Sequence, residues 1–244
     1  MQYPEPLVRG RLVRRYKRFL SDIEIDSPDG SGGSVEVTAH CANPGSMLGL
    51  AQPGATVWLL PNRNPAAKLD WRWELTDTGD TLVCINTARA NTVVGEALTA
   101  GGIPALAAYS KIRPEVKYGT SSRIDFLLEE DGIPPAYVEV KSVTLRRPDG
   151  GDPTAAEFPD SVTKRGAKHL EELMEVGKAG ARPVMFFLVQ RGDCSHFRPA
   201  SDIDPAYAEA LKRAAAAGVE ILCHTAHVAT DGITLGPSLP LHLD

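Results

Sequence analysis

The sequence contains few cysteines, no long apolar run and no excess of positive charge. Its four cysteines, Cys41, Cys84, Cys194 and Cys223, are scattered and form no C-x-x-C pair, which argues against a zinc site and for reduced, structural thiols. No apolar stretch approaches the roughly 20 residues that a membrane-spanning helix needs. The N-terminus has no apolar core of signal-peptide length. We therefore expect a cytoplasmic protein without a membrane anchor.

The formal net charge of −5 excludes a protein coated in basic residues. It leaves nucleic-acid binding open, because binding depends on a local basic patch and not on the sum of the charges. With 244 residues, of which 43% are hydrophobic, the chain has enough apolar material for one large domain or two small ones. Its 22 glycines and 19 prolines indicate many turns.

Residues 1–88 read as a small all-β domain. Short β-prone runs such as "VEVTAHC" and "QPGATVWLLP" alternate with turn signals about every ten residues, among them the flexible turn "SPDGSGGS". Such spacing fits a small closed or nearly closed barrel. From residue 89 to residue 244 the pattern changes to an α/β order of helix, strand, strand, helix, strand, helix, strand. Within it, "SVTKRGAKHLEELMEVGKAG" predicts the clearest helix and "RPVMFFLVQRG" a buried central strand, so we expect a mixed central sheet.

The stretch "AYVEVKSVTL" reads as a buried strand that carries two charges in its centre. Positions i and i+2 of a strand share one face, so Glu139 and Lys141 stand side by side while Val138 and Val140 point the other way. For an isolated E-x-K, a half-exposed strand with a charged outer face is the more common explanation. The neighbouring residues must distinguish the two interpretations.

An aspartate on the preceding strand favours a site over a charged surface. Asp125 lies within "SRIDFLL", although Asp is depleted from strands, and the short connection "EEDGIPP" predicts that the two strands pair as an antiparallel hairpin. Asp125 and Glu139 then approach each other, and a divalent cation turns their repulsion into binding energy. We expect both carboxylates, with the Val140 carbonyl, to hold the metal. Lys141 would orient or deprotonate an attacking water, or stabilise charge on phosphorus.

The same residues carry a family resemblance. An Asp followed about fourteen residues later by E-x-K resembles the PD-(D/E)XK nuclease superfamily. Together with "LVRRYKRFLSDIEI", "AHCANPGSMLGL", "RGAKHLEEL" and "FFLVQR", the hairpin is similar to the sugar fermentation stimulation protein A family, from about Leu12 to Ile233. The resemblance departs from the superfamily pattern in one respect, because no Pro precedes Asp125.

The resemblance implies an N-terminal OB-like β-barrel and a PD-(D/E)XK nuclease-like α/β domain. It also implies DNA binding, with strandedness open. The paired carboxylates suit Mg²⁺ or Mn²⁺ as the metal. Whether the chain is an enzyme stays open at this point. The alternatives are an active metal-dependent nuclease with Asp125, Glu139 and Lys141 as catalytic residues, and a catalytically silent regulator of sugar metabolism genes. A sugar-handling enzyme has no motif in its favour. The sequence does not indicate an oligomeric state.

Two segments of the predicted barrel are candidates for nucleic-acid contact. In "RGRLVRRYKR", Arg14, Arg15, Lys17 and Arg18 alternate with aromatic residues, as in a groove that grips a nucleic-acid strand, although a charged, solvated strand edge has the same composition. In the loop "HCANPGSM", Asn43 and Ser46 offer polar groups to a phosphate or to the other domain. Ordinary turn chemistry uses the same residues.

Further candidates lie on the helices and strands of the second domain. Arg165, His169 and Glu172 share a stripe on the clearest helix, and we expect Arg165 and His169 to contact a phosphate unless the stripe is a surface ion-pair row. Glu96 would add a carboxylate to the metal site, or else is an exposed helix residue. Glu115 and Lys117 precede Asp125 and would line the same cleft, with Lys117 as a possible accessory residue.

Overall fold

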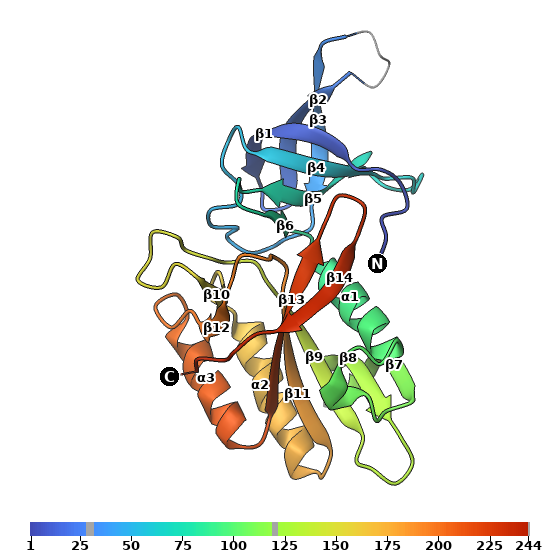
Figure 1. Cartoon of the computed structure of the whole chain (residues 1–244), viewed down its shortest axis with the longest axis vertical. Helices are drawn as coiled ribbons and strands as arrows, with labels where there is room; N and C mark the ends of the chain where they lie inside the picture. Colours follow the sequence, from blue (N-terminus) through green and yellow to red (C-terminus); the bar gives the residue numbers. More distant parts are fainter. Residues whose placement is uncertain (28–31, 119–121, 244) are drawn as a thin grey trace.

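The computed structural model describes residues 1–27, 32–118 and 122–243. Residues 28–31 of the expected turn "SPDGSGGS" lie outside the described part. The chain forms a β-barrel that stands above an α/β domain (Figure 1). The last barrel strand ends at Cys84 and the first helix of the second domain begins at Ala88.

Six strands form the first domain: β1 (Val8–Tyr16), β2 (Leu20–Asp26), β3 (Ser34–Cys41), β4 (Thr56–Pro61), β5 (Trp71–Asp77) and β6 (Leu82–Cys84). They are hydrogen-bonded in the order β3-β2-β1-β4-β5-β6, and an additional parallel pairing of β3 with β5 closes a five-stranded barrel. Inward-facing apolar residues fill the interior, among them Leu12, Ile23 and Trp73. The expected OB-like barrel is confirmed.

The second domain is built on a six-stranded mixed sheet. Its helices are α1 (Ala88–Thr99), α2 (Lys164–Lys178) and α3 (Pro205–Ala216), with a 3-10 turn at Pro104–Leu106. Its strands are β7 (Lys111–Tyr118), β8 (Ser122–Glu129), β9 (Ala136–Val143), β11 (Arg182–Val189), β13 (Glu220–Val228) and β14 (Ile233–Ser238), and the short strands β10 (Ala155–Phe158) and β12 (His196–Pro199) pair separately. No helix in the described residues is long and apolar enough to cross a membrane.

The apolar strand "RPVMFFLV" lies at the centre of this sheet, as its composition predicts. The order is β14-β13-β11-β9-β8-β7, and β11 pairs in parallel with both β9 and β13. Side chains that alternate along the strands form two separate cores. The first packs against α1, and the second packs against α2 and α3 (Figure 1).

The strand β8 departs from simple alternation at Asp125. Phe126 and Leu128 belong to the core on the α1 face, but Ile124 belongs to the core on the α2 face. Strand alternation in "SRIDFLL" predicts that Ile124, Phe126 and Leu128 share one face, and this prediction is wrong for Ile124. Opposite Asp125 on β7 lies Glu115, whose φ of 54° is left-handed. This local irregularity is where the candidate site forms.

The two domains are joined by specific contacts. The Ser46 hydroxyl donates to the Asp160 carbonyl (2.6 Å), and the Met47 N–H donates to the Asp160 carboxylate (3.0 Å). The first residues of the chain also lie against the second domain, because the Tyr3 N–H donates to the Asp231 carbonyl (3.0 Å). The barrel loop is thus tied to the segment that leads into α2.

Candidate metal centre

Asp125 occupies the point where β8 and β9 separate. The paired residues end with Phe126 opposite Val138, and one position further the Asp125 side chain takes over the hydrogen bonding. Its Oδ2 accepts the Val140 N–H (2.7 Å) and its Oδ1 accepts the Asn91 amide of α1 (2.7 Å). Continuing the register places Asp125 opposite Glu139, as the hairpin predicts.

Glu139 is buried beside Asp125, and only one of its two oxygens has a hydrogen-bond partner. Oε1 accepts the Lys141 Nζ at 2.6 Å and lies against His169 Nδ1 of α2. Oε2 is buried and has no partner among the described residues. The residue is 3% exposed, so this oxygen carries the desolvation cost of an unpaired polar group.

A cavity of about 380 Å³ opens over the two carboxylates. Its lining contains both acidic and basic side chains: Glu115, Ser122, Arg123, Asp125, Glu139, Arg165, Lys168 and His169. Lys141 is not among the lining residues, and its side chain is 14% exposed. The cavity thus combines carboxylates at its base with cations at its walls.

The two carboxylates have opposite pKa shifts. Burial, followed by the negative charge of Glu139, raises the pKa of Asp125 to about 6. Burial also opposes ionisation of Glu139, but the hydrogen bond to His169 and the Lys141 charge outweigh it and hold the pKa of Glu139 below its ordinary value. Glu139 is the charged member of the pair, and it makes ionisation of Asp125 costly in the absence of a cation.

The donor set fits a hard divalent cation. An unpartnered buried carboxylate oxygen and a second carboxylate meet at one cavity, and Mg²⁺ uses one or two carboxylates with water and substrate oxygens. Within the described ranges, no group of three or more His, Cys, Asp or Glu side chains is arranged to hold a metal alone. The fit is therefore to a site that water or substrate completes.

The stripe on α2 faces the hairpin, with Arg165 exposed, Glu172 half-buried and His169 buried. Arg165 lines the cavity, and its Nε donates to His169 Nε2 (3.3 Å). His169 is 5% exposed and bound to Glu139, so burial and this contact keep it from being the exposed phosphate ligand that we expected. Glu172 accepts the Ser122 hydroxyl (2.7 Å). Glu172 also forms an i,i+4 ion pair with Lys168 (3.4 Å), so the ion-pair alternative holds for this one residue of the stripe.

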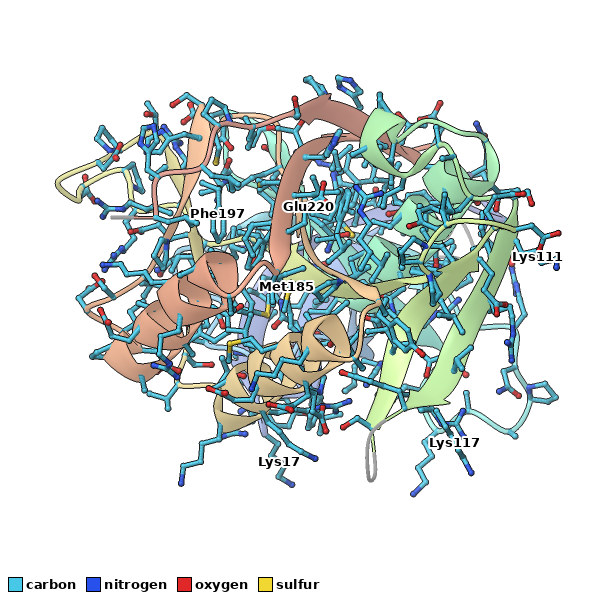
Figure 2. All side chains as sticks on the ribbon, turned by 90° about the horizontal axis from the view of Figure 1, so that it is seen from below. Lys17, Lys111, Lys117, Met185, Phe197 and Glu220 are labelled. Carbon is cyan, nitrogen blue, oxygen red and sulfur yellow. The ribbon has the colours of Figure 1, made fainter. Side chains whose placement is uncertain are left out.

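Of the accessory residues predicted for the metal cavity, only some line it. Glu96 forms an ion pair with the Met1 amino group (2.6 Å) and does not line the cavity, so the structure does not bring it to the metal centre. Asn91 is the α1 residue that contacts Asp125. Glu115 lines the cavity as expected, whereas Lys117 lies on the adjoining surface beside Arg123. Figure 2 shows Lys117 and Lys17 projecting from the same side of the molecule.

The basic run of the barrel has two kinds of residue. Arg14 pairs with Asp22 (2.8 Å), and Arg15 donates to the carbonyls of Asn43 (2.8 Å) and Gly45 (2.9 Å). These contacts fasten the strand to its own domain. Lys17 and Arg18 lie in the β1–β2 turn with left-handed φ values of 48° and 63°, where both side chains are exposed.

The loop "HCANPGSM" is organised by its own hydrogen bonds. The Asn43 amide donates to the Ile85 carbonyl (3.0 Å) and accepts the Gly45 N–H (2.9 Å), and Asn43 is 4% exposed. Its side chain is therefore used inside the fold and not offered to a phosphate. Ser46 contacts the other domain through Asp160, which is one of the two roles considered for this loop.

Sequence reasoning missed Asn91 and the bond between His169 and Glu139. Asn91 stands one helix away from the hairpin, and an Asn in a helix gives no local signal of its partner. The His169 spacing to Arg165 was visible, but the sequence does not show which buried carboxylate the stripe meets. Both contacts are tertiary.

The fold and the site together define an OB barrel joined to a PD-(D/E)XK nuclease-like domain. Residues 13–85 match the SfsA N-terminal OB domain, and residues 88–232 match the sugar fermentation stimulation protein RE domain. The chain belongs to the sugar fermentation stimulation protein family.

Relatives of similar length support this assignment. The homolog of Paramagnetospirillum magneticum is 53% identical over 243 residues, covering 100% of this chain and 98% of its own, and that of Roseobacter denitrificans is 52% identical over 244 residues, covering 100% of both. The structure of Pyrococcus furiosus SfsA in complex with Ca²⁺ superposes with a TM-score of 0.85 at 26% identity, covering 99% of this chain and 98% of that one.

Proposed function

We propose that the chain binds DNA and cleaves its backbone with Mg²⁺ or Mn²⁺ held by Asp125 and Glu139. The observation that carries the proposal is the buried, unpartnered Oε2 of Glu139 beside a second carboxylate at the base of a cavity. The Ca²⁺ bound to the Pyrococcus furiosus relative supports a divalent ion, since Ca²⁺ and Mg²⁺ both prefer oxygen ligands. We also propose a cytoplasmic location, in keeping with the four unpaired cysteines.

The residues around the cavity have different roles in the proposed phosphodiester hydrolysis. A bound divalent ion supplies Lewis-acid polarisation and lowers the pKa of a water molecule. Asp125 and Glu139 provide its carboxylate oxygens, with the Val140 carbonyl as the further ligand that the sequence predicts. The Lys141 ammonium donates to Glu139 Oε1 and neutralises its charge. To act on the attacking water, as the sequence predicts, the Lys141 side chain must extend beyond this hydrogen bond.

Cations at the wall of the cavity suit a phosphate backbone. Arg165, Lys168 and Arg123 line it and come from α2 and β8. Charge-assisted hydrogen bonds from such side chains hold phosphate oxygens in place. The overall charge of −5 makes this local concentration of cations significant.

A second cavity provides a path for DNA from the barrel toward the metal cavity. Arg18 of the β1–β2 turn and Thr163, which caps α2, line this cavity of about 320 Å³ between the domains, and its lining also contains the acidic residues Glu157 and Asp160. Two residues after Thr163, Arg165 reaches the metal cavity. We assign DNA contact to Lys17, Arg18 and Arg165. Arg14, Arg15, Asn43 and Ser46 support the path through the contacts that hold its loops.

The experiment that tests the proposal is a cleavage and binding assay. Labelled single- and double-stranded DNA is incubated with the purified protein and Mg²⁺, Mn²⁺ or EDTA. We expect cleavage with Mg²⁺ or Mn²⁺ that EDTA and Glu139→Gln abolish. The matched control is Glu175→Gln, an exposed glutamate of α2, which should cleave like the wild type.

A second candidate is a DNA-binding protein that does not cut. The observation in its favour is that Lys141 is bonded to Glu139 and does not line the cavity within the described residues. DNA retention without cleavage in any of the metals would establish this function. Absence of binding to either form of DNA would reject both candidates.

A further inference from the structure

Two side chains meet at a single oxygen of Glu139. Oε1 receives Lys141 Nζ (2.6 Å) and contacts His169 Nδ1, while Oε2 has no hydrogen-bond partner among the described residues. An ionised carboxylate accepts through both oxygens equally, so this asymmetry is imposed by the surroundings. It leaves one oxygen with unused acceptor capacity in a residue that lines the metal cavity.

Arg165 determines which nitrogen of His169 carries the proton. Its Nε donates to His169 Nε2 at 3.3 Å, and a guanidinium has no acceptor and stays protonated. Nε2 must therefore be the acceptor nitrogen, and the imidazole proton is on Nδ1. From there His169 donates to Glu139 Oε1. The 3.1 Å approach of Lys141 Nζ to Nδ1 is then a contact between two donors that share one acceptor.

The position of His169 is fixed by the packing of α2. The helix begins at a side-chain cap, where Thr163 Oγ1 accepts the Gly166 N–H (3.0 Å). The neighbouring residues Leu170 and Leu173 are fully buried in the core beneath the sheet. The imidazole thus cannot follow Glu139 if that side chain rotates, and it holds the carboxylate in one orientation.

We propose that His169, oriented by Arg165, is a positioning residue that occupies Oε1 of Glu139 and directs Oε2 toward the divalent ion. The inference rests on the proposed function. His169 does not touch the metal or the phosphate; it acts through Glu139. Outer contacts of this kind change metal affinity or activity by about 10- to 100-fold when they are removed.

Mn²⁺ affinity, measured by titration calorimetry on the full chain without DNA, tests the proposal. We expect His169→Ala to weaken Mn²⁺ binding about 10- to 100-fold. His169→Asn, whose amide nitrogen replaces Nδ1 as a donor, should restore most of the affinity. Arg165→Ala should weaken binding less, and Lys178→Ala on the same helix, exposed and paired with Glu175, should leave it unchanged.

A spectroscopic measurement of the His169 tautomer in the wild type tests the proposal even if the variants do not fold. Long-range ¹⁵N–¹H correlation spectra report which imidazole nitrogen is protonated. The proposal requires His169 in the Nδ1–H form without metal, and in Arg165→Ala a shift toward the Nε2–H form. An Nε2–H imidazole in the wild type overturns the proposal.

The results separate this inference from the proposed function. If the wild type binds Mn²⁺ and His169→Ala binds it equally well, the positioning role is wrong while the metal centre stands. If the wild type does not bind Mn²⁺ and does not cut DNA, the proposed function fails and the positioning role fails with it. If it binds Mn²⁺ with the expected loss in His169→Ala but cuts no DNA, the positioning role is supported and only the cleavage is rejected.

Discussion

The buried carboxylates of the barrel and of the metal cavity differ in how many of their oxygens have hydrogen-bond partners. Glu74 of β5 is fully buried, yet its two oxygens accept Arg89 (2.7 and 2.9 Å) and the Asn86 amide. Glu139 is as deeply buried, and one of its oxygens has no partner among the described residues. A buried carboxylate whose two oxygens both accept hydrogen bonds stabilises the fold. A buried carboxylate oxygen without a partner destabilises the fold, so folding alone does not explain it. The difference favours the second domain as the location of the proposed metal centre.

The aspartates show the same contrast. Burial opposes ionisation of Asp22 in the barrel, but hydrogen bonds from Arg14, Thr38 and Tyr16 outweigh it, so the pKa of Asp22 is lowered. Burial and the nearby charge of Glu139 raise the pKa of Asp125 to about 6. One carboxylate is stabilised by its surroundings as an anion, and the other needs a cation that the described side chains do not fully supply.

The largest effect should come from Glu139→Gln. The substitution keeps the shape but removes the charge and the oxygen that we assign to the metal. Cleavage should fall by more than about 100-fold, since even contacts behind a ligand are worth about 10- to 100-fold. Initial rates with Mn²⁺ measure this. Cleavage by Glu139→Gln within a few-fold of the Glu175→Gln control would show that the unpartnered oxygen of Glu139 does not serve the reaction.

Glu74→Gln should give the opposite phenotype. Loss of the carboxylate leaves the guanidinium of Arg89 buried without its partner, which costs about 3–5 kcal/mol in the free energy of unfolding. Chemical denaturation measures the loss. At temperatures where the variant is folded, Mn²⁺ affinity should equal that of the wild type. A stable Glu74→Gln variant with weakened Mn²⁺ binding would show that the two carboxylates do not differ in role.

Asp125→Asn should change how stability depends on pH in EDTA. An ordinary Asp titrates near 3.8, and the folded state raises this pKa to about 6, so the unfolded chain releases its proton first. The wild type therefore loses stability as pH rises from about 4 to about 6, and the Asn variant does not. Over that window the stability difference should move in favour of the variant by about 2–3 kcal/mol. A difference that stays constant from pH 4 to pH 7 contradicts the shift.

Asp160→Ala tests the contact between the two regions. The variant removes the acceptor of the Met47 N–H but keeps the backbone carbonyl that Ser46 binds. We expect a loss of about 1 kcal/mol in stability. Thermal unfolding should show it, and Asp131→Ala, an exposed turn residue, is the control. If the contact aligns the proposed DNA path, DNA affinity also falls while Mn²⁺ affinity stays unchanged.

The smallest effect should come from the double variant Lys17→Ala, Arg18→Ala. Removing two phosphate contacts should weaken DNA binding and lower the slope of log K against log salt by about 1.4 to 1.8. Arg11→Ala is the matched control, because Arg11 is already paired with Glu24. Fluorescence anisotropy at several salt concentrations measures the slopes. Equal slopes for the double variant and the control would show that Lys17 and Arg18 in the β1–β2 turn do not contact DNA phosphates.

The sequence predicted those features that local pattern determines. Alternation placed Glu139 and Lys141 on one face, and the short hairpin connection placed Asp125 opposite Glu139. The continuous apolar run at β11 predicted the centre of the sheet. In each case the informative residues are near one another in the chain, or are linked by a single turn.

Features that depend on distant segments could not be predicted. Glu96 has the right residue type for a metal ligand, but the Met1 amino group binds it, and Asn91 reaches Asp125 instead. Asn43 has the composition of a ligand-binding loop, but burial against Ile85 gives it a structural role. Ile124 breaks the strand alternation at the point where the pairing of β8 with β9 ends. Tertiary packing overrides the local pattern in all three cases.

The most direct test is a crystal structure with Mn²⁺, using anomalous scattering to locate the ion. We expect one anomalous peak within coordination distance, about 2.1–2.3 Å, of an Asp125 oxygen and of Glu139 Oε2, with His169 still on Oε1. Repeating the experiment with Glu139→Gln should remove the peak. Mn²⁺ bound only elsewhere, or crystals of the wild type that take up no Mn²⁺ at this cavity, would show that Asp125 and Glu139 do not form a metal centre.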